Sequence, residues 1–276
     1  MSELRQEYPL RNLLKMAGLA RSTFYYQQKV KSLPDQHEQL KASIQAVYDN
    51  HRGRYGYRRI TTTICKLGTL VNHKKVRRLM GELGIKSLVR PKKYRSYRGS
   101  EGKIAENLLN REFAAEGPNQ KWVTDVTEFK VAGEKLFLSP VLDLYNGEII
   151  AFETARRPEF SMIGSMLEKA LAKLSSKDRP MLHSDQGWQY QMPAYQRTLQ
   201  KHLIKQSMSR KGNCYDNAVM ENFFGILKSE LFYLKKFTSL EELQKEVTDY
   251  IQYYNYDRIK LKLKGLSPVQ YRTQPS

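Results

Sequence analysis

Three acidic residues stand at positions where an unpaired charge is costly. Asp125 lies inside the apolar run 121–131, and Asp185 follows the apolar start of a predicted strand at 181–184. Acids at the ends of neighbouring strands repel each other unless a cation lies between them, and ligation by oxygen alone suits Mg²⁺ or Mn²⁺ rather than zinc. Glu221, near the start of a predicted helix, would complete a site where two divalent ions about 4 Å apart split phosphodiesters. Singly, each acid is more simply a turn, edge or solvent residue.

Three further side chains are candidates for roles beside these acids. Lys228 follows Glu221 by two helical turns, so both project from nearly the same helix face, and the lysine would hold a substrate phosphate there. The competing interpretation is a solvated helix lysine. His183 shares a strand face with Asp185, and Asp143 lies in the second predicted strand. Either residue would neighbour the ions without binding them, or be a satisfied core histidine and a structural carboxylate.

The positive charge of the chain is strongly localised. The sequence has 47 Lys and Arg against 28 Asp and Glu, a net charge of +19, and residues 51–98 hold 15 of the basic residues and a single acid, Glu82. So many positive charges in one segment repel each other unless a polyanion neutralises them, so nucleic acid is the expected partner. Tyr55, Tyr57 and other tyrosines are interleaved with the bases and offer faces for stacking.

Two helical units should carry this charge. Residues 10–28 predict two helices around a turn at Gly18, with Leu14, Leu19 and Phe24 facing inward, as in a helix-turn-helix motif. A second unit is predicted from inward residues in three helices, namely Leu40, Ile44 and Val47; Ile60, Ile64 and Leu67; and Val76, Leu79, Met80 and Leu83. Asn72 is the expected N-cap of its last helix and Gly84 the residue that ends it. The residues expected to face DNA are Arg58, Arg59, Lys74, Lys75, Arg77 and Arg78.

The acids require a different architecture, an α/β sheet. Strand-like runs at 121–131, 135–145 and 148–155, with turn residues at Gly133 and Asn146–Gly147, predict an antiparallel meander. Helix at 161–174, strand at 181–184, helix at 194–202, strand at 205–208 and helix from 218 complete the order βββαβαβα, the ribonuclease H topology.

The chain end is predicted to be helical. Ser239 and Glu242 form a capping-box pattern before an apolar stripe, and Ser267–Pro268 starts a short last helix. We therefore predict a helix-turn-helix-like segment at 1–35, a basic helical DNA-binding domain at 36–89, a linker at 90–118, a ribonuclease-H-like catalytic core at 119–236 and a C-terminal helical extension at 237–276.

The motifs around the three acids resemble those of a known family. WVTDVTEF at Asp125, LHSDQGWQY at Asp185 and DNAVMENFFGILKSE at Glu221 resemble the DDE triad of insertion-sequence transposases and retroviral integrases, and 35 residues separate the last two acids. The extended match is to the OrfB protein of the insertion-sequence-three family. It runs through YGYRRI, VNHKKVRRLM, NLLNREF, PNQKWVTDVT, SMSRKGNCYDNAVMENFF, YYNYDRIKLKLKG and LSPVQYR.

This resemblance implies a DNA transposase. It implies Mg²⁺-dependent strand cleavage and transfer at the element's ends, with Asp125, Asp185 and Glu221 holding two metal ions and Mn²⁺ able to substitute. It implies a loop over the active site at 207–217, where Arg210, Lys211 and Asn213 would touch DNA. The implied partners are terminal-repeat and target DNA, further copies of the chain on that DNA, and an upstream OrfA protein or a fused OrfA–OrfB form.

Two rival functions remain open from the sequence. A non-catalytic DNA-binding regulator would use only residues 1–98, and a structure-selective nuclease of the same fold would cleave DNA without joining it. Cys65 and Cys214 form no CxxC pair, which disfavours a zinc finger, and no apolar run reaches the roughly 18 residues of a membrane span. We therefore expect a cytoplasmic protein with no membrane partner.

Overall fold

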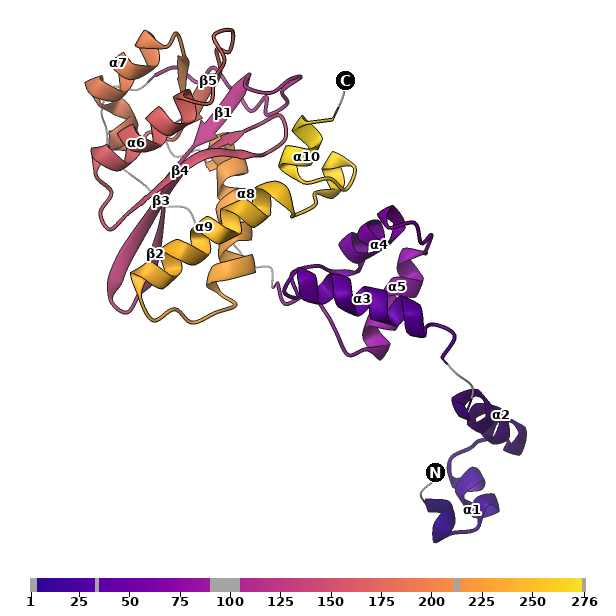
Figure 1. The fold of residues 1–276 in the computed structure, drawn as a ribbon. Helices are drawn as coiled ribbons and strands as arrows, with labels where there is room; N and C mark the ends of the chain where they lie inside the picture. The colour runs from indigo at the N-terminus through magenta and orange to yellow at the C-terminus, as the bar shows by residue number, and fades with distance from the viewer. Residues whose placement is uncertain (1–3, 33–34, 90–104, 211–213, 275–276) are drawn as a thin grey trace.

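The computed structural model describes residues 4–32, 35–89, 105–210 and 214–274. It begins with a helical pair, in which Leu14 and Phe24 are buried as predicted (Figure 1). Leu19 was predicted to face inward and is 42% exposed, because it lies in the connection after the left-handed Gly18 rather than on a helix face. The elements of this pair are a 3₁₀ turn at Leu4–Gln6, α1 at Leu10–Met16 and α2 at Arg21–Ser32.

A unit of three helices follows, and its core is the predicted one. Ile44, Ile60 and Val76 are fully buried, Val47, Ile64, Leu79 and Met80 are buried beside them, and Leu40 and Leu83 pack partly buried against this cluster. The Asn72 side chain accepts a bond from the backbone N–H of Lys74, which confirms the predicted N-cap. Leu67 was expected inside but is 74% exposed, since it caps the end of its helix. The helices are α3 at Glu38–Asn50, α4 at Tyr57–Lys66 and α5 at His73–Glu82.

The core of the protein is one mixed sheet, and its element order is the predicted βββαβαβα. Two central strands, β1 and β5, run parallel, and the first three strand runs are antiparallel. The strands are β1 at Lys121–Thr124, β2 at Thr127–Val131, β3 at Glu134–Asp143, β4 at Ile149–Ala155, β5 at Met181–Ser184 and β6 at Lys205–Met208.

The predicted strand 121–131 is interrupted at Asp125 and Val126. Its two halves, β1 and β2, pair with the same partner β3 in a continuous register, with Thr124 opposite Val141 and Thr127 opposite Leu138. Pro140 lies opposite the interruption and has no N–H to give to the ladder. The interruption between β1 and β2 therefore falls at Asp125, one of the three candidate acids.

Helices cover both faces of the sheet and bury two apolar layers (Figure 1). Trp122 and Leu182 face a layer with α6 and α7, whereas Val123, Phe129 and Leu138 face a layer with α8 and α9. Short helical turns join several of these elements. The helices are α6 at Phe160–Leu171, α7 at Pro193–Lys201, α8 at Ala218–Leu227, α9 at Leu240–Tyr256 and α10 at Pro268–Arg272, with a π-helical turn at Lys228–Phe232 directly after α8.

The C-terminal caps are only partly those predicted. Ser267 forms a complete capping box with Gln270 at the start of α10. Ser239 caps α9 by accepting the N–H of Glu242, but the Glu242 carboxylate binds the N–H and hydroxyl of Thr238 instead of closing a box. Among the described residues no helix is long and apolar enough to span a bilayer.

The three-helix unit docks on the C-terminal part through a buried ion cluster. Glu230, 3% exposed, accepts two bonds from Arg258 at 2.7 and 2.8 Å and one from the Tyr250 hydroxyl at 2.9 Å. From the three-helix unit, Arg59 approaches the same carboxylate at 3.4 Å and the buried Arg54 donates to the Glu230 carbonyl at 3.0 Å. The π-helical turn is thus a junction between the basic helices and the core.

Candidate active site

Asp125 and Asp185 lie side by side at the carboxyl ends of two parallel strands. Val123 of β1 pairs with His183 of β5, so the two acids, each two residues further on, lie at one level on the same face of the sheet. Val123 belongs to the apolar layer under α8 and α9, which identifies that face. Neighbouring strands are about 4.8 Å apart, so the two carboxylates share one space.

Local turns orient both carboxylates. The Oδ1 atom of Asp125 accepts the N–H of Val126 at 2.7 Å, and that of Asp185 accepts the N–H of Gly187 at 2.8 Å. A Cβ atom on Gly187 would lie 2.9 Å from the Asp185 Oδ1 and 2.6 Å from the Gln189 amide. A side chain at Gly187, two residues after Asp185, would therefore displace Gln189 or the Asp185 carboxylate.

Glu221 approaches the pair from the first turn of α8, a helix that contacts β1. The pKa of Asp125 is raised well above its ordinary value, first by burial and then by the charges of Asp185 and Glu221. Burial also raises the pKa values of Asp185 and Glu221. Three carboxyls that are hard to ionise together form a site that would be stabilised by added positive charge.

Lys228 lies on the same side as Asp125, as the sequence predicts. Its ammonium is 5.3 Å from the centre of the Phe129 ring, and it starts the π-helical turn after α8. Burial lowers the pKa of Lys228, while the charges of Glu128 and Asp125 oppose that shift. A half-buried cation beside the acids is suited to a phosphate, and π-helical turns are frequent at functional sites.

The donor set fits Mg²⁺ or Mn²⁺ in its chemistry, since all three groups are carboxylates. In the part of the chain that the structure describes, no three His, Cys, Asp or Glu side chains are grouped tightly enough to enclose an ion. Closing the set requires rotation of the carboxylate side chains toward one another, which the rotatable side-chain bonds of Asp and Glu permit.

His183 is fully buried and both its ring nitrogens are bonded. The Ser207 hydroxyl oxygen accepts the N–H groups of Leu108 at 3.0 Å and Leu109 at 3.1 Å, so its proton goes to His183 Nδ1 at 2.8 Å. The ring proton then lies on Nε2 and is donated to Ser209 Oγ at 3.1 Å. Burial lowers the pKa of His183 to about 4. This network makes His183 a neutral residue that joins the strands beside Asp185.

Asp143 lies away from the acids. It pairs with Trp122, three residues before Asp125 and so about 10 Å along the strand. Its buried carboxylate accepts the N–H of Asn119 at 2.9 Å and forms an ion pair with Arg272 of α10. Asp143 therefore ties the C-terminal helix to the sheet, which agrees with the structural alternative that the sequence left open for it.

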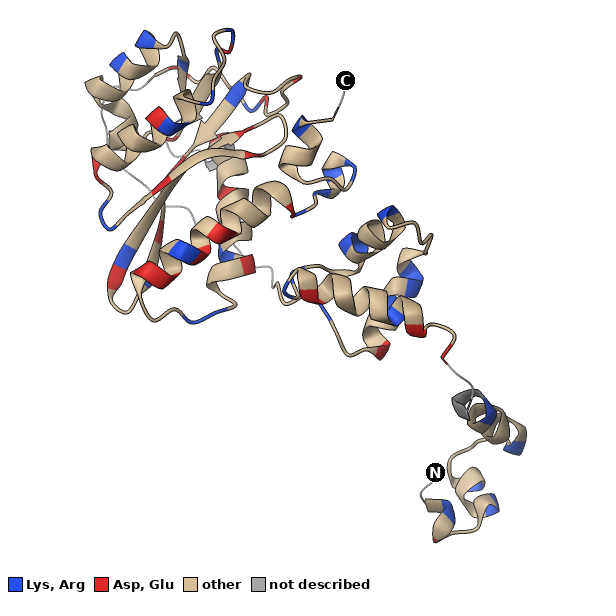
Figure 2. Cartoon of the chain, in the orientation of Figure 1, with Lys and Arg blue, Asp and Glu red and all other residues tan. Residues whose placement is uncertain are grey.

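The basic residues expected at DNA fall into two groups. Lys74, Arg77 and Arg58 are exposed on α4 and α5, where Figure 2 shows several basic residues along the ribbon, and both arginines lie 5.8 Å from the centre of the Tyr57 ring. Arg59 is largely covered by Glu230. Lys75 is half-buried, and Arg78 is paired with Glu82 on its own helix.

Arg210, predicted in the loop over the site, is half exposed and bonded to a buried aspartate, Asp216. Lys211 and Asn213 lie outside the described residues. Sequence reasoning missed the role of Asp216 and its second partner, Arg111. Both residues lie in the quoted family motifs, but nothing in their spacing shows that they meet.

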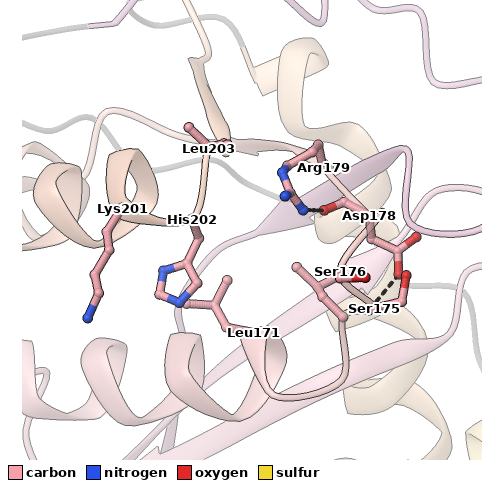
Figure 3. Close-up of a pocket in the computed structure, with 9 residues that line it drawn as sticks. Leu171, Ser175, Ser176, Asp178, Arg179, Lys201, His202 and Leu203 are labelled. Carbon is pink, nitrogen blue, oxygen red and sulfur yellow. Dashed lines mark hydrogen bonds between the residues drawn. The ribbon is translucent and has the colours of Figure 1, made fainter.

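A cavity of about 250 Å³ is found elsewhere on the core (Figure 3). It lies between the ends of α6 and α7, and Arg179 and His202 are among its lining residues. Arg179 precedes β5 whereas Asp185 follows it, so this cavity lies at the opposite end of the strand from the carboxylates.

Comparisons with known proteins agree with this arrangement. Residues 115–214 and 221–275 match families described as integrase core domain, and residues 35–93 match the family described as HTH-like domain. The chain is 56% identical to a protein of Escherichia coli K12 named as transposase InsK of insertion sequence element IS150, over 99% of this chain and 97% of that protein. It is 30% identical to transposase InsF of insertion sequence IS3A from the same organism, over 97% and 95% of the two chains.

A solved structure resembles the fold. The simian T-cell lymphotropic virus intasome, in complex with PP2A regulatory subunit B56 gamma, has a TM-score of 0.50 and 18% identity over 84% of this chain and 75% of that one. At this identity the likeness concerns the fold alone. The two bacterial relatives match along almost their whole length. The chain therefore belongs to the insertion-sequence transposases with an integrase core, the family of the IS150 and IS3 transposases.

Proposed function

We propose that this transposase cleaves and joins DNA strands at the ends of its element with Asp125, Asp185 and Glu221 as its catalytic acids. The observation that carries the proposal is the shared electrostatics of the three carboxyls, in which Asp185 and Glu221 both raise the pKa of Asp125. A cluster of mutually repelling acids at parallel strand ends gains most from divalent cations. Two Mg²⁺ ions, with Mn²⁺ as substitute, would supply positive charge at the scissile phosphate.

The residues of the chain have separate tasks in this reaction. The three acids hold the cations, and Lys228 binds a nearby phosphate oxygen of the substrate strand. Proton acceptance by His183 is disfavoured, because both its nitrogens are already bonded. The proton of the attacking water therefore passes to bulk water or to a substrate oxygen. In cleavage, water attacks the phosphorus of the phosphodiester and the 3′-oxygen leaves as a free 3′-hydroxyl. In the joining step that 3′-hydroxyl attacks a target phosphodiester, and the target strand's own 3′-oxygen leaves.

The direct test is strand nicking of a labelled duplex that carries the element's end, in Mg²⁺. Glu221→Gln should reduce nicking to background and leave duplex binding unchanged. Glu168→Gln, an exposed glutamate on α6, is the matched control and should nick like the wild type. Undiminished nicking by Glu221→Gln would refute the assignment.

Products distinguish this proposal from its rivals. A transposase yields a strand-transfer product, whereas a structure-selective nuclease yields nicks without joining. A regulator binds the duplex and shows no metal-dependent reaction. We further propose that several copies act together on the DNA, with an OrfA protein or in a fused form; the mass of the protein–DNA complex, measured with and without OrfA, tests this.

A further inference from the structure

A second charged cluster borders the three acids. Asp216 is fully buried directly before α8. Its carboxylate accepts bonds from the backbone N–H and Nε of Arg210, each at 3.0 Å, from Nε of Arg111 at 2.9 Å and from the Asn107 amide at 2.8 Å. Burial would raise the pKa of Asp216, but the bonds from Arg210 and Arg111 lower it to about 2. The carboxylate is thus a fixed anion.

The two arginines keep a large part of their side chains in solvent. The side chains of Arg210 and Arg111 are 52% and 47% exposed, while the aspartate between them is 0% exposed. Two positive charges face one negative charge, so the cluster retains a net positive charge. The side-chain hydrogen bonds of Arg210 to the described residues use Nε and Nη2, which leaves the Nη1 donors for a ligand.

The backbone that presents Arg111 is strained. Asn110 and Arg111 have φ angles of +42° and +64°, two consecutive left-handed residues that are not glycine. Such conformations persist only where the surroundings enforce them, and they gather at functional sites. Here Asn107 enforces the turn, since its side chain accepts the N–H of Asn110 and donates to Asp216. The strain places Arg111 against Asp216, 105 residues away in sequence.

The cluster lies next to the catalytic acids. Ser184 of β5 pairs with Met208 of β6, and the N–H of Ser209 then binds the Ser184 carbonyl at 2.9 Å. Ser209 is therefore level with Asp185, and Arg210 lies one residue further along the chain, just after the adjoining strand β6. On the other side, Asp216 is five residues before Glu221. The cluster therefore borders the acids on the side of β6 and on the side of the segment before α8.

We infer that Arg111 and Arg210, held by Asp216, form a binding site for a backbone phosphate of the DNA strand in the active site. Arginine side chains match phosphate oxygens with paired N–H donors, and a buried carboxylate that fixes Nε leaves the outer donors oriented. In this arrangement Asp216 is a positioning residue and does not touch the DNA. The inference rests on the proposed function for the choice of strand, but not for the presence of the phosphate site.

The experiment measures binding of the full chain to a fluorescein-labelled 30-base-pair duplex of arbitrary sequence, by anisotropy at several NaCl concentrations without divalent ions. Arg111→Gln and Arg210→Gln should each weaken binding and reduce the slope of log affinity against log salt by about 1. Arg179→Gln, an exposed arginine at the opposite end of β5, should leave the slope unchanged. Asp216→Asn should weaken binding with its two arginines still present.

The alternative is a purely structural tie between segment 105–113 and the core. In that case both arginine variants would melt at a lower temperature while their salt slopes stayed at the wild-type value, and this result would overturn the inference. Arg210→Lys keeps the positive charge and removes the guanidinium N–H donors. It should therefore keep the wild-type salt slope and bind the duplex more weakly. Because this assay contains no divalent ions and measures no nicking, its outcome is read separately from the catalytic assignment of Asp125, Asp185 and Glu221.

Discussion

Replacing Glu230 by Gln should cost more stability than any other single charge removal in the described fold. The Glu230 carboxylate receives Arg258 at 2.7 and 2.8 Å, Tyr250 at 2.9 Å and Arg59 at 3.4 Å. Arg258 is 2% exposed and cannot recover its hydration when its partner loses the charge. Burial alone would raise the pKa of Glu230, yet the bonds and charge of Arg258 hold it below its ordinary value.

The size of the stability loss in Glu230→Gln follows from Arg258, the buried partner that remains. Breaking a buried ion pair from one side costs about 3–5 kcal/mol, because a buried charge is left without compensation. At about 2–4 °C per kcal/mol, the melting temperature should fall by about 6–20 °C. The exposed pair of Arg156 and Glu241 gives the contrast, since both side chains stay hydrated and Glu241→Gln should leave the melting temperature nearly unchanged.

Thermal and urea unfolding followed by circular dichroism at pH 7 measure these differences. The double replacement Glu230→Met with Arg258→Met should recover most of the loss, since apolar side chains can replace a buried pair at little cost. A lowered carboxyl pKa stabilises the fold above the ordinary value of 4.5, so the difference between Glu230→Gln and wild type should shrink as the pH falls below it. If Glu230→Gln cost no more than Glu241→Gln, the account of this junction would be wrong.

Three further outcomes are expected. Asp125→Asn should raise the melting temperature in EDTA at pH 7.5, because a carboxyl with a raised pKa destabilises the fold once it ionises; a lower melting temperature would contradict the crowded-acid site. Calorimetric affinity for Mg²⁺ should increase from pH 5.5 to 7.5 with release of protons, and an affinity independent of pH would count against these acids as ligands. Lys74→Gln and Arg77→Gln should each reduce the salt slope of duplex binding by about 1. Unchanged slopes would show that this face of α5 does not contact DNA.

Local patterns predicted the elements well where one segment determines its own conformation. The strands at 181–184 and 205–208 and the helix beginning at Ala218 are found at the predicted residues. The cap at Asn72 and the end of its helix at Gly84 are likewise local, since each depends on bonds within one turn. Asp125 and Asp185 are neighbours because parallel strand ends meet at one edge, which topology alone implies.

Several features that the sequence did not predict involve partners that are distant in sequence. The break at Asp125 depends on Pro140 in another strand, and the structural role of Asp143 depends on Arg272, 129 residues away. Asp216 is one of many acids until Arg111 lies against it. Leu67 was wrongly placed inside because the helical period was extended one residue past the end of its helix. Long-range charge pairing leaves no periodic signal, so these roles emerge only from the fold.

The central claim is that Asp125, Asp185 and Glu221 together bind divalent cations. Anomalous diffraction from crystals of the full chain soaked in MnCl₂, recorded near the manganese absorption edge, tests it most directly. The account predicts a peak between Asp125 and Asp185, with Glu221 turned toward it and with no peak in Asp125→Asn crystals. Saturating manganese that left this space empty, or bound only elsewhere on the molecule, would contradict it.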